Sequence, residues 1–317
     1  MSRISKQAGQ LRKMWSGFQS ARALFTANNY RVFDHLAKQK TSDQLAKDIG
    51  ADKRATEILL DALTGLGLLK KQGRKYRNAA MASRFLVSGE RYYQGNIIRH
   101  ADFMWNSWSG LDNVLKTGDP HRRSRDHNAF ILGMHDLAVL KARQVIRSIG
   151  VRNVKKALDL GGGPGTYSME MASKGVHTVL FDTPETIKIA GDVINKAKVK
   201  GIEFLRGDFF HDDLGKDYDL ILISQILHSY SVKDNISLLK KCSRALNSNG
   251  RVAIQDFLIS EDRTRPVQSA LFSINMLVNN EGRCYSPGEI RGWFLKAGFK
   301  GVRKASIEDG LLMTARK

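Results

Sequence analysis

The chain has 317 residues, 42% of them hydrophobic, which is enough for two domains with separate cores. It contains no uninterrupted apolar run of roughly 18 residues, so we expect no membrane-spanning helix. The net charge of +20 favours an anionic partner such as an acidic small substrate. The basic residues are spread along the whole chain, which disfavours nucleic acid as the partner. Cys242 and Cys284 lack the spacing of a disulfide framework or a metal site, so we expect no metal and a reducing, cytoplasmic compartment.

The first 33 residues contain no Asp or Glu but six basic residues. This composition is typical of an organelle transit peptide, and also of a basic amphipathic helix that packs on a partner subunit. Apolar residues at helical spacing favour the packed helix: Leu11, Met14, Trp15 and Phe18. The transit peptide remains open as the alternative.

Two helices and a hairpin are expected next. The stretch from Thr41 to Gly50 has a capping residue and a terminal glycine, and "DKRATEILLDALTGLGLL" continues as an amphipathic helix. "LLKKQGRKYRNA" alternates around Gly73 like a two-stranded wing. This winged-helix arrangement indicates either DNA binding or a dimerisation platform. The second helix is too apolar to contact a groove of DNA, so we favour dimerisation.

Residues 85–150 are expected to be mostly helical. The most charged and loop-like stretch, "KTGDPHRRSRDHN", is taken as the boundary between a domain of residues 1–118 and one of residues 119–317. From Lys155 onward, short apolar runs alternate with helical segments, which predicts a doubly wound α/β fold with a parallel sheet. Near the C-terminus, Asp309-Gly310 joins two strand-like runs as an antiparallel hairpin. A parallel sheet with a late hairpin favours the methyltransferase variant of the Rossmann-like fold.

The stretch "LDLGGGPGTYS" places a glycine loop at the carboxyl end of the first strand, where open α/β sheets bind ligands. Gly161 and Gly163 fit a dinucleotide fingerprint, but Thr166 occupies the position of its third glycine. Asp182 ends the second strand, where an acidic residue accepts ribose hydroxyls. Its alternative role is to cap the helix that begins at Thr183-Pro184, although Thr183 can serve as that cap.

Asp208 and Phe209 end the third strand, where an acid and an aromatic ring can bind adenine. No phosphate-binding loop is present, so an adenosine without phosphates fits best, and S-adenosyl-L-methionine is such a ligand. We expect its pocket to include Asp159, Gly165 and Ser224 as well.

Over most of its length the chain resembles the caffeic acid and hydroxyindole O-methyltransferase family. The similarity rests on the winged-helix third and on the order of "LDLGGGPGTYS", "FDTPETI", "GDFF", "LHSYS" and "EGR". The resemblance implies a homodimer and a cofactor pocket at Gly161, Gly163, Asp182, Asp208 and Phe209.

His228 follows the fourth strand and faces the ligand side of the sheet. A neutral imidazole can remove the proton of a phenol, whose pKa is about 10, as the methyl group arrives. The resemblance implies that His228 is this general base and that Asp256, at the end of the fifth strand, orients it. The family's second acidic position holds Cys284, so either Asp256 acts alone, Glu281 substitutes, or the chemistry differs from phenol methylation.

The resemblance also implies substrate contacts at Phe130, Met134 and Asn279, for which ordinary core packing is the alternative. The predicted function is O-methylation of a small aromatic or polyketide hydroxyl. The alternatives are C-methylation of a chlorophyll-type tetrapyrrole acid, methylation of nucleic acid, and a non-methylating cofactor-binding relative.

Overall fold

The computed structural model describes residues 3–121, 126–307 and 310–317. The chain forms two compact units, Met1–Phe103 and Met104–Lys317. This division lies earlier in the chain than the boundary expected at residues 118–119. Across the described residues, no helix combines the length and hydropathy needed to cross a membrane.

The first unit is mostly helical and contains a small three-stranded sheet in the order β1-β3-β2. Two helices followed by a hairpin, as expected from the sequence, are present as α3, α4 and β2–β3. The elements are α1 (Arg3–Asn29), α2 (Val32–His35), β1 (Lys40–Thr41), α3 (Ser42–Ile49), α4 (Lys53–Gly65), β2 (Leu69–Gln72), β3 (Lys75–Asn78), α5 (Ala80–Phe85) and the start of α6 (Gly95–Trp108).

Local sequence signals set the ends of these helices. The Thr41 side chain accepts a hydrogen bond from the Gln44 N–H, and the Gln44 side chain accepts one from the Thr41 N–H, which completes a capping box at the start of α3. Gly50 ends the helix in the left-handed conformation. The apolar sides of α2, α3 and α4 pack into one core with Leu45, Leu60 and Tyr76.

The predicted N-terminal helix is present as α1. Its apolar residues Leu11, Met14 and Trp15 are 62%, 76% and 61% exposed. The single chain therefore leaves a stripe of large hydrophobic side chains on α1 in contact with solvent.

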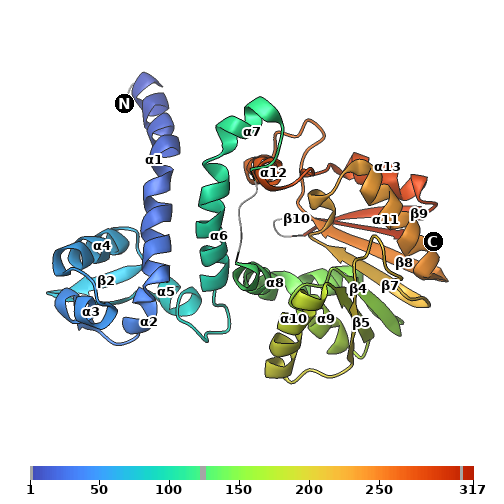
Figure 1. The fold of residues 1–317 in the computed structure, drawn as a ribbon, viewed down its shortest axis with the longest axis horizontal. Helices are drawn as coiled ribbons and strands as arrows, with labels where there is room; N and C mark the ends of the chain where they lie inside the picture. Colours follow the sequence, from blue (N-terminus) through green and yellow to red (C-terminus); the bar gives the residue numbers. More distant parts are fainter. Residues whose placement is uncertain (1–2, 122–125, 308–309) are drawn as a thin grey trace. The chain divides into compact units, whose positions relative to one another are not determined.

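The second unit is a seven-stranded sheet with helices on both faces (Figure 1). The strand order is β6-β5-β4-β7-β8-β10-β9; β10 is antiparallel to both β8 and β9, and the pairs from β6 to β8 are parallel. The strands are β4 (Lys156–Leu160), β5 (His177–Asp182), β6 (Ile202–Arg206), β7 (Tyr218–Ser224), β8 (Leu246–Asp256), β9 (Lys300–Ile307) and β10 (Gly310–Arg316). The predicted parallel sheet with a late antiparallel hairpin is confirmed. Asp309, which was expected in the turn of this hairpin, lies outside the described residues.

Two layers of helices bury the sheet. One face packs against α8, α9 and α10, and the other against α11 and α13. The central strand β7 is apolar along its length because both of its faces are covered. The helices are α7 (Leu111–Thr117), α8 (His127–Ile149), α9 (Thr166–Ala172), α10 (Pro184–Ala197), the 3₁₀ turn η1 (Leu227–Ser229), α11 (Val232–Ala245), α12 (Val267–Asn279) and α13 (Pro287–Lys296).

Candidate active site

The glycine loop connects β4 to α9 at the carboxyl edge of the sheet. Gly161, Gly163 and Gly165 have φ angles of 67°, 53° and 77°, which side chains other than glycine rarely adopt. The N–H groups of Gly161 and Gly162 donate to the carbonyl oxygen of Phe181 on the neighbouring strand. The loop is therefore tied to the end of β5, beside Asp182.

The glycines of this loop differ in what surrounds them. A β-carbon on Gly161 would lie 2.5 Å from Ile226 Cδ1, and one on Gly165 would lie 2.8 Å from Ile194 Cδ1. A β-carbon on Gly163 would have no atom within 4 Å. The first two glycines thus permit close packing inside the protein, whereas Gly163 faces open space that a ligand can enter.

Asp182 combines a structural role with spare hydrogen-bonding capacity. Its Oδ2 accepts from Gly163 N at 2.9 Å, and its Oδ1 accepts from Thr183 N at 2.8 Å. Thr183 is the N-cap of α10 and Pro184 is the first residue of the helix, so Asp182 is not the cap. Burial raises the pKa of this carboxyl group. A carboxylate has about four acceptor positions, so acceptor capacity remains for a ligand hydroxyl.

Asp159 lies beneath the glycine loop and is 1% exposed. Its Oδ2 accepts a hydrogen bond of 2.6 Å from Ser168 Oγ, while its Oδ1 has no partner among the described residues. Burial, with a smaller contribution from Asp182, raises the pKa of Asp159 to about 6. A buried carboxylate oxygen without a partner is costly, and a donor from a bound ligand would satisfy it.

Asp208 and Phe209 follow β6 and lie in different surroundings. Phe209 is half-buried, and its Cε1 would be 3.7 Å from a β-carbon on Gly161. Its ring meets that of Tyr230 edge-on at 5.7 Å. Asp208 is exposed, and its Oδ1 accepts from Phe210 N at 2.8 Å. Phe209 thus lies beside the glycine loop, whereas Asp208 lies at the surface.

Ser224 belongs to a buried polar group that the sequence did not reveal. Its Oγ lies 2.7 Å from Oε1 of Gln255, and the Tyr167 hydroxyl reaches the same oxygen at 3.4 Å. Burial raises the pKa of Tyr167 to about 12, so its hydroxyl stays protonated. Adjacent parallel strands bring Ser224 and Gln255 together, a pairing that has no local sequence signal.

His228 and Asp256 form a buried pair. His228 lies in η1 after β7, and Asp256 is the last residue of the adjacent strand β8. His228 Nδ1 is 2.7 Å from Asp256 Oδ1, and the two residues are 7% and 5% exposed. The same oxygen accepts from Phe257 N at 2.8 Å, which orients the carboxylate.

The second ring nitrogen of His228 remains available. In the part of the chain that the structure describes, no hydrogen bond reaches His228 Nε2. Because the Asp256 carboxylate can only accept, the neutral imidazole carries its proton on Nδ1 and its lone pair on Nε2. The rings of Phe257 and Phe272 lie 5.5 and 5.1 Å from the imidazole. The geometry is therefore one in which His228 could accept a proton next to aromatic rings.

Cys284 and Glu281 were the other positions considered for a second acid, and neither lies against His228 as a carboxylate. Cys284 is 1% exposed, and burial raises the pKa of its thiol to about 12, so it is uncharged. Its backbone N–H donates to Ser273 Oγ at 3.1 Å. Glu281 is exposed to solvent. Only Asp256 contacts His228 as an acid within the described residues.

The expected substrate residues lie on two helices. Phe130 and Met134 are half-buried and one turn apart on α8. Asn279 is half-buried at the end of α12, and its Nδ2 donates to Asn275 O at 2.8 Å.

Two histidines of α8 that the sequence did not single out contact the cofactor-side loops. His135 Nδ1 is 2.8 Å from Thr166 Oγ1, directly after the glycine loop. His127 Nε2 is 3.2 Å from Thr186 Oγ1, in the helix that follows Asp182. Burial lowers the pKa of His135, which favours the neutral ring. Helix α8 thereby anchors the starts of α9 and α10.

Comparison with known protein families gives two matches along the chain. An O-methyltransferase domain matches residues 96–300, and an O-methyltransferase dimerisation domain matches residues 13–88.

Individual relatives agree with these matches. The chain is 33% identical to 3-hydroxy-5-methyl-1-naphthoate 3-O-methyltransferase of Streptomyces sahachiroi, covering 91% of this chain and 88% of that one. The solved structure of PigF with SAH is 26% identical, with a TM-score of 0.89 and coverage of 98% and 99%. Human N-acetylserotonin methyltransferase in complex with SAM has the same fold, with a TM-score of 0.90, 24% identity and coverage of 100% and 98%. None of these three is described as acting on a tetrapyrrole or a nucleic acid, so those alternatives are not favoured.

Proposed function

Because the chain belongs to the O-methyltransferase family, we propose that it methylates a hydroxyl group of a small aromatic or polyketide-like acid, with His228 as the general base. The family's dimerisation domain at residues 13–88 supports a homodimer. The single observation that carries the proposed mechanism is the 2.7 Å contact between His228 Nδ1 and Asp256 Oδ1.

The pair has the features that a general base needs. Asp256 holds the proton on Nδ1, so His228 Nε2 can accept the proton of a bound hydroxyl. Positive charge that develops on the imidazole is stabilised by the adjacent carboxylate. The surrounding rings of Phe257 and Phe272 provide an apolar surface for an aromatic substrate.

The residues at the carboxyl edge of the sheet fit S-adenosyl-L-methionine, which supplies an electrophilic methyl group. The unpartnered Oδ1 of Asp159 is suited to the ammonium group, and Asp182 to the ribose hydroxyls. Gly163 leaves room for the ligand, and Phe209 provides an aromatic face beside the loop. The similarity to PigF with SAH supports this assignment. We also assign Gly161, Gly165, Asp208 and Ser224 to this pocket.

An acidic aromatic substrate is consistent with two independent features. The chain carries a net charge of +20, which attracts anions. The Streptomyces sahachiroi relative is named for the 3-O-methylation of a naphthoate, an aromatic carboxylate with a free hydroxyl. Phe130, Met134 and Asn279 are proposed to contact this substrate.

The test is a methylation assay over a panel of aromatic hydroxyacids with radiolabelled S-adenosyl-L-methionine, in parallel with chlorin acids and with RNA. We expect methyl transfer to phenolic hydroxyls of the aromatic acids, and its loss in His228→Ala. Transfer to chlorin carbon or to RNA in preference to every phenol would contradict the proposal, as would full phenol activity in the variant.

A further inference from the structure

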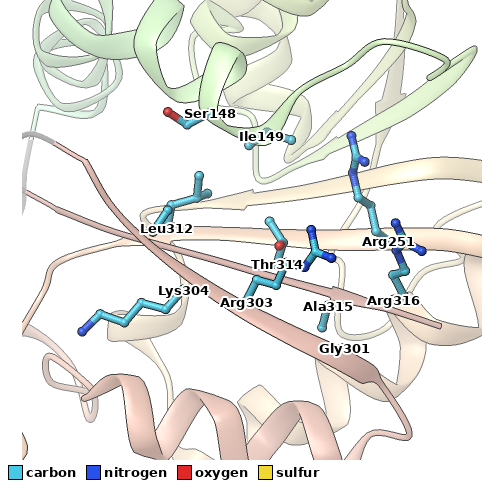
Figure 2. Close-up of a pocket in the computed structure, with 11 residues that line it drawn as sticks. Ser148, Ile149, Arg251, Gly301, Arg303, Lys304, Leu312, Thr314, Ala315 and Arg316 are labelled. Atoms are coloured by element: carbon cyan, nitrogen blue, oxygen red, sulfur yellow. The ribbon is translucent and has the colours of Figure 1, made fainter.

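A cavity lies between β8, β9, β10 and the end of α8 (Figure 2), and it has a volume of about 250 Å³. One end of it reaches Leu312, whose partner on β8 is Gln255. Arg251, which lines the other end, is five residues from Asp256 on β8, or about 16 Å along the strand. The arginine-lined end of the cavity is therefore distant from Asp256.

Three arginines on three adjacent strands share this face of the sheet. Arg316 pairs directly with Arg251 across β10 and β8, and Arg303 pairs with Thr314 across β9 and β10. Cross-strand partners lie on one face, so Arg251, Arg303 and Arg316 all face the side that α8 covers. In Figure 2 the side chains of Arg251, Arg303 and Arg316 lie to the right of Ser148, and the side chain of Lys304, which also lines the cavity, extends to the lower left.

No acidic residue offsets this charge. The residues lining the cavity include no Asp or Glu, and within the described chain none of the three arginines forms a salt bridge. Arg251 donates to the carbonyl oxygen of Gly150, but its Nε is buried without a partner. Burial and the nearby Arg316 both lower the pKa of Arg251.

Such an arrangement is unfavourable in the empty protein. Like charges directly opposite each other on neighbouring strands are destabilising, and a buried guanidinium N–H without an acceptor adds to the cost. Packing does not require arginine at the exposed positions 303 and 316. A bound anion would remove both penalties, because guanidinium groups form paired hydrogen bonds with oxyanions.

We propose that this cavity binds a small, multiply charged oxyanion of the phosphate class through Arg251, Arg303 and Arg316. Ser148 and Thr314, which carry hydroxyl groups, also line the cavity. The volume suits an anion of the size of pyrophosphate. The site adds a second ligand to the enzyme, independent of the methyl donor and the methyl acceptor.

The experiment is calorimetric titration of the full chain with pyrophosphate in 150 mM NaCl, with citrate as a carboxylate comparison. The decisive pair of variants is Arg303→Gln and Arg291→Gln. Both remove one positive charge from an exposed arginine, but Arg303 lines the cavity, whereas Arg291 belongs to α13 on the other face of the sheet. We expect Arg303→Gln to weaken pyrophosphate binding about tenfold and Arg291→Gln less than twofold. Arg316→Gln repeats the test on β10.

Several results would overturn the proposal. These are an absence of pyrophosphate binding up to about 10 mM, equal losses in the Arg303 and Arg291 variants, or binding of citrate as tight as that of pyrophosphate. Tighter binding of a short single-stranded DNA, with the same dependence on Arg303, would assign the surface to nucleic acid instead.

Discussion

Gly282 packs directly against the backbone of His228. A β-carbon built on Gly282 would lie 2.0 Å from the His228 carbonyl oxygen and 2.7 Å from the carbonyl carbon of Ser229. The atoms in the way belong to the main chain, so a side-chain rotation cannot relieve the overlap. The "EGR" segment therefore holds the turn that carries the proposed base.

Gly282→Ala is expected to displace this turn, destabilise the protein by about 1–3 kcal/mol and reduce kcat strongly. The measurements are thermal unfolding and methyl-transfer kinetics. Gly292→Ala is the matched control: Gly292 lies within α13, and a β-carbon there would meet nothing within 4 Å. That control should be more stable by about 0.5–1 kcal/mol. Equal behaviour of the two variants would contradict the proposed role of Gly282.

Removing the base should affect catalysis far more than cofactor binding. His228→Ala is expected to lower kcat by about 10²- to 10⁴-fold while leaving the dissociation constant of S-adenosylhomocysteine within about threefold. Asp256→Asn should also lower kcat, because an amide can donate to Nδ1 and so favour the wrong tautomer. Steady-state kinetics and calorimetry on the same preparations separate the two effects. A His228→Ala enzyme with normal kcat would refute the assignment.

Cys284 lies where the family resemblance implies a second acid, and we expect it to be a bystander. Burial keeps its thiol uncharged, with a pKa of about 12, so it cannot supply the negative charge of a second acid. Cys284→Ser should therefore change kcat by less than about threefold, since the two side chains are similar in size. A hundredfold loss in a folded variant would instead assign the thiol a direct part in the reaction.

Because we propose that Asp159 binds the cofactor, we expect cofactor binding to depend on pH. Its pKa in the folded, ligand-free protein is about 6, above the ordinary value of 3.8, so the group becomes uncharged as the pH falls through 6. Binding of an ammonium group requires the charged carboxylate. The dissociation constant of S-adenosylhomocysteine should be flat above pH 7 and rise below pH 6, by at most about tenfold per pH unit.

The raised pKa of Asp159 also makes the stability of the folded protein depend on pH, in the opposite direction to cofactor binding. Because the folded chain holds this proton more tightly than the unfolded chain, the contribution of Asp159 to stability is present at low pH and is lost as the pH rises from 3.8 through 6. Asp159→Asn should remove both dependences. Unchanged pH profiles in that variant would show that another group is responsible, and Asp182 is the first to test, since burial also raises its pKa.

Asp182→Asn is expected to weaken S-adenosylhomocysteine binding about 10- to 100-fold, the usual effect of losing hydrogen bonds to a charged group. Asp192→Asn is its control, because this substitution makes the same change in charge at an exposed position of α10. Calorimetry at pH 7.5 measures both. Equal affinities in the two variants would remove Asp182 from the proposed pocket.

Local sequence signals were sufficient for the fold. The apolar runs matched β4, β5 and β7 because a strand buried on both faces has to be apolar along its length. Thr41 and Gly50 marked the ends of α3 because capping is a short-range interaction. The glycine loop was visible because a left-handed backbone selects glycine.

Tertiary structure alone decided which side chains meet. The contact of His228 with Asp256 joins a residue of the turn after β7 to the last residue of β8, 28 positions further along the chain, and the register between β7 and β8 brings them together. The same holds for Gln255 beneath Ser224 and for Arg251 opposite Arg316. Register depends on the packing of the whole sheet rather than on neighbouring residues. The sequence by itself therefore determined the elements and the cofactor-side loop, whereas the fold decided the partners of the proposed base and the arginine-lined cavity.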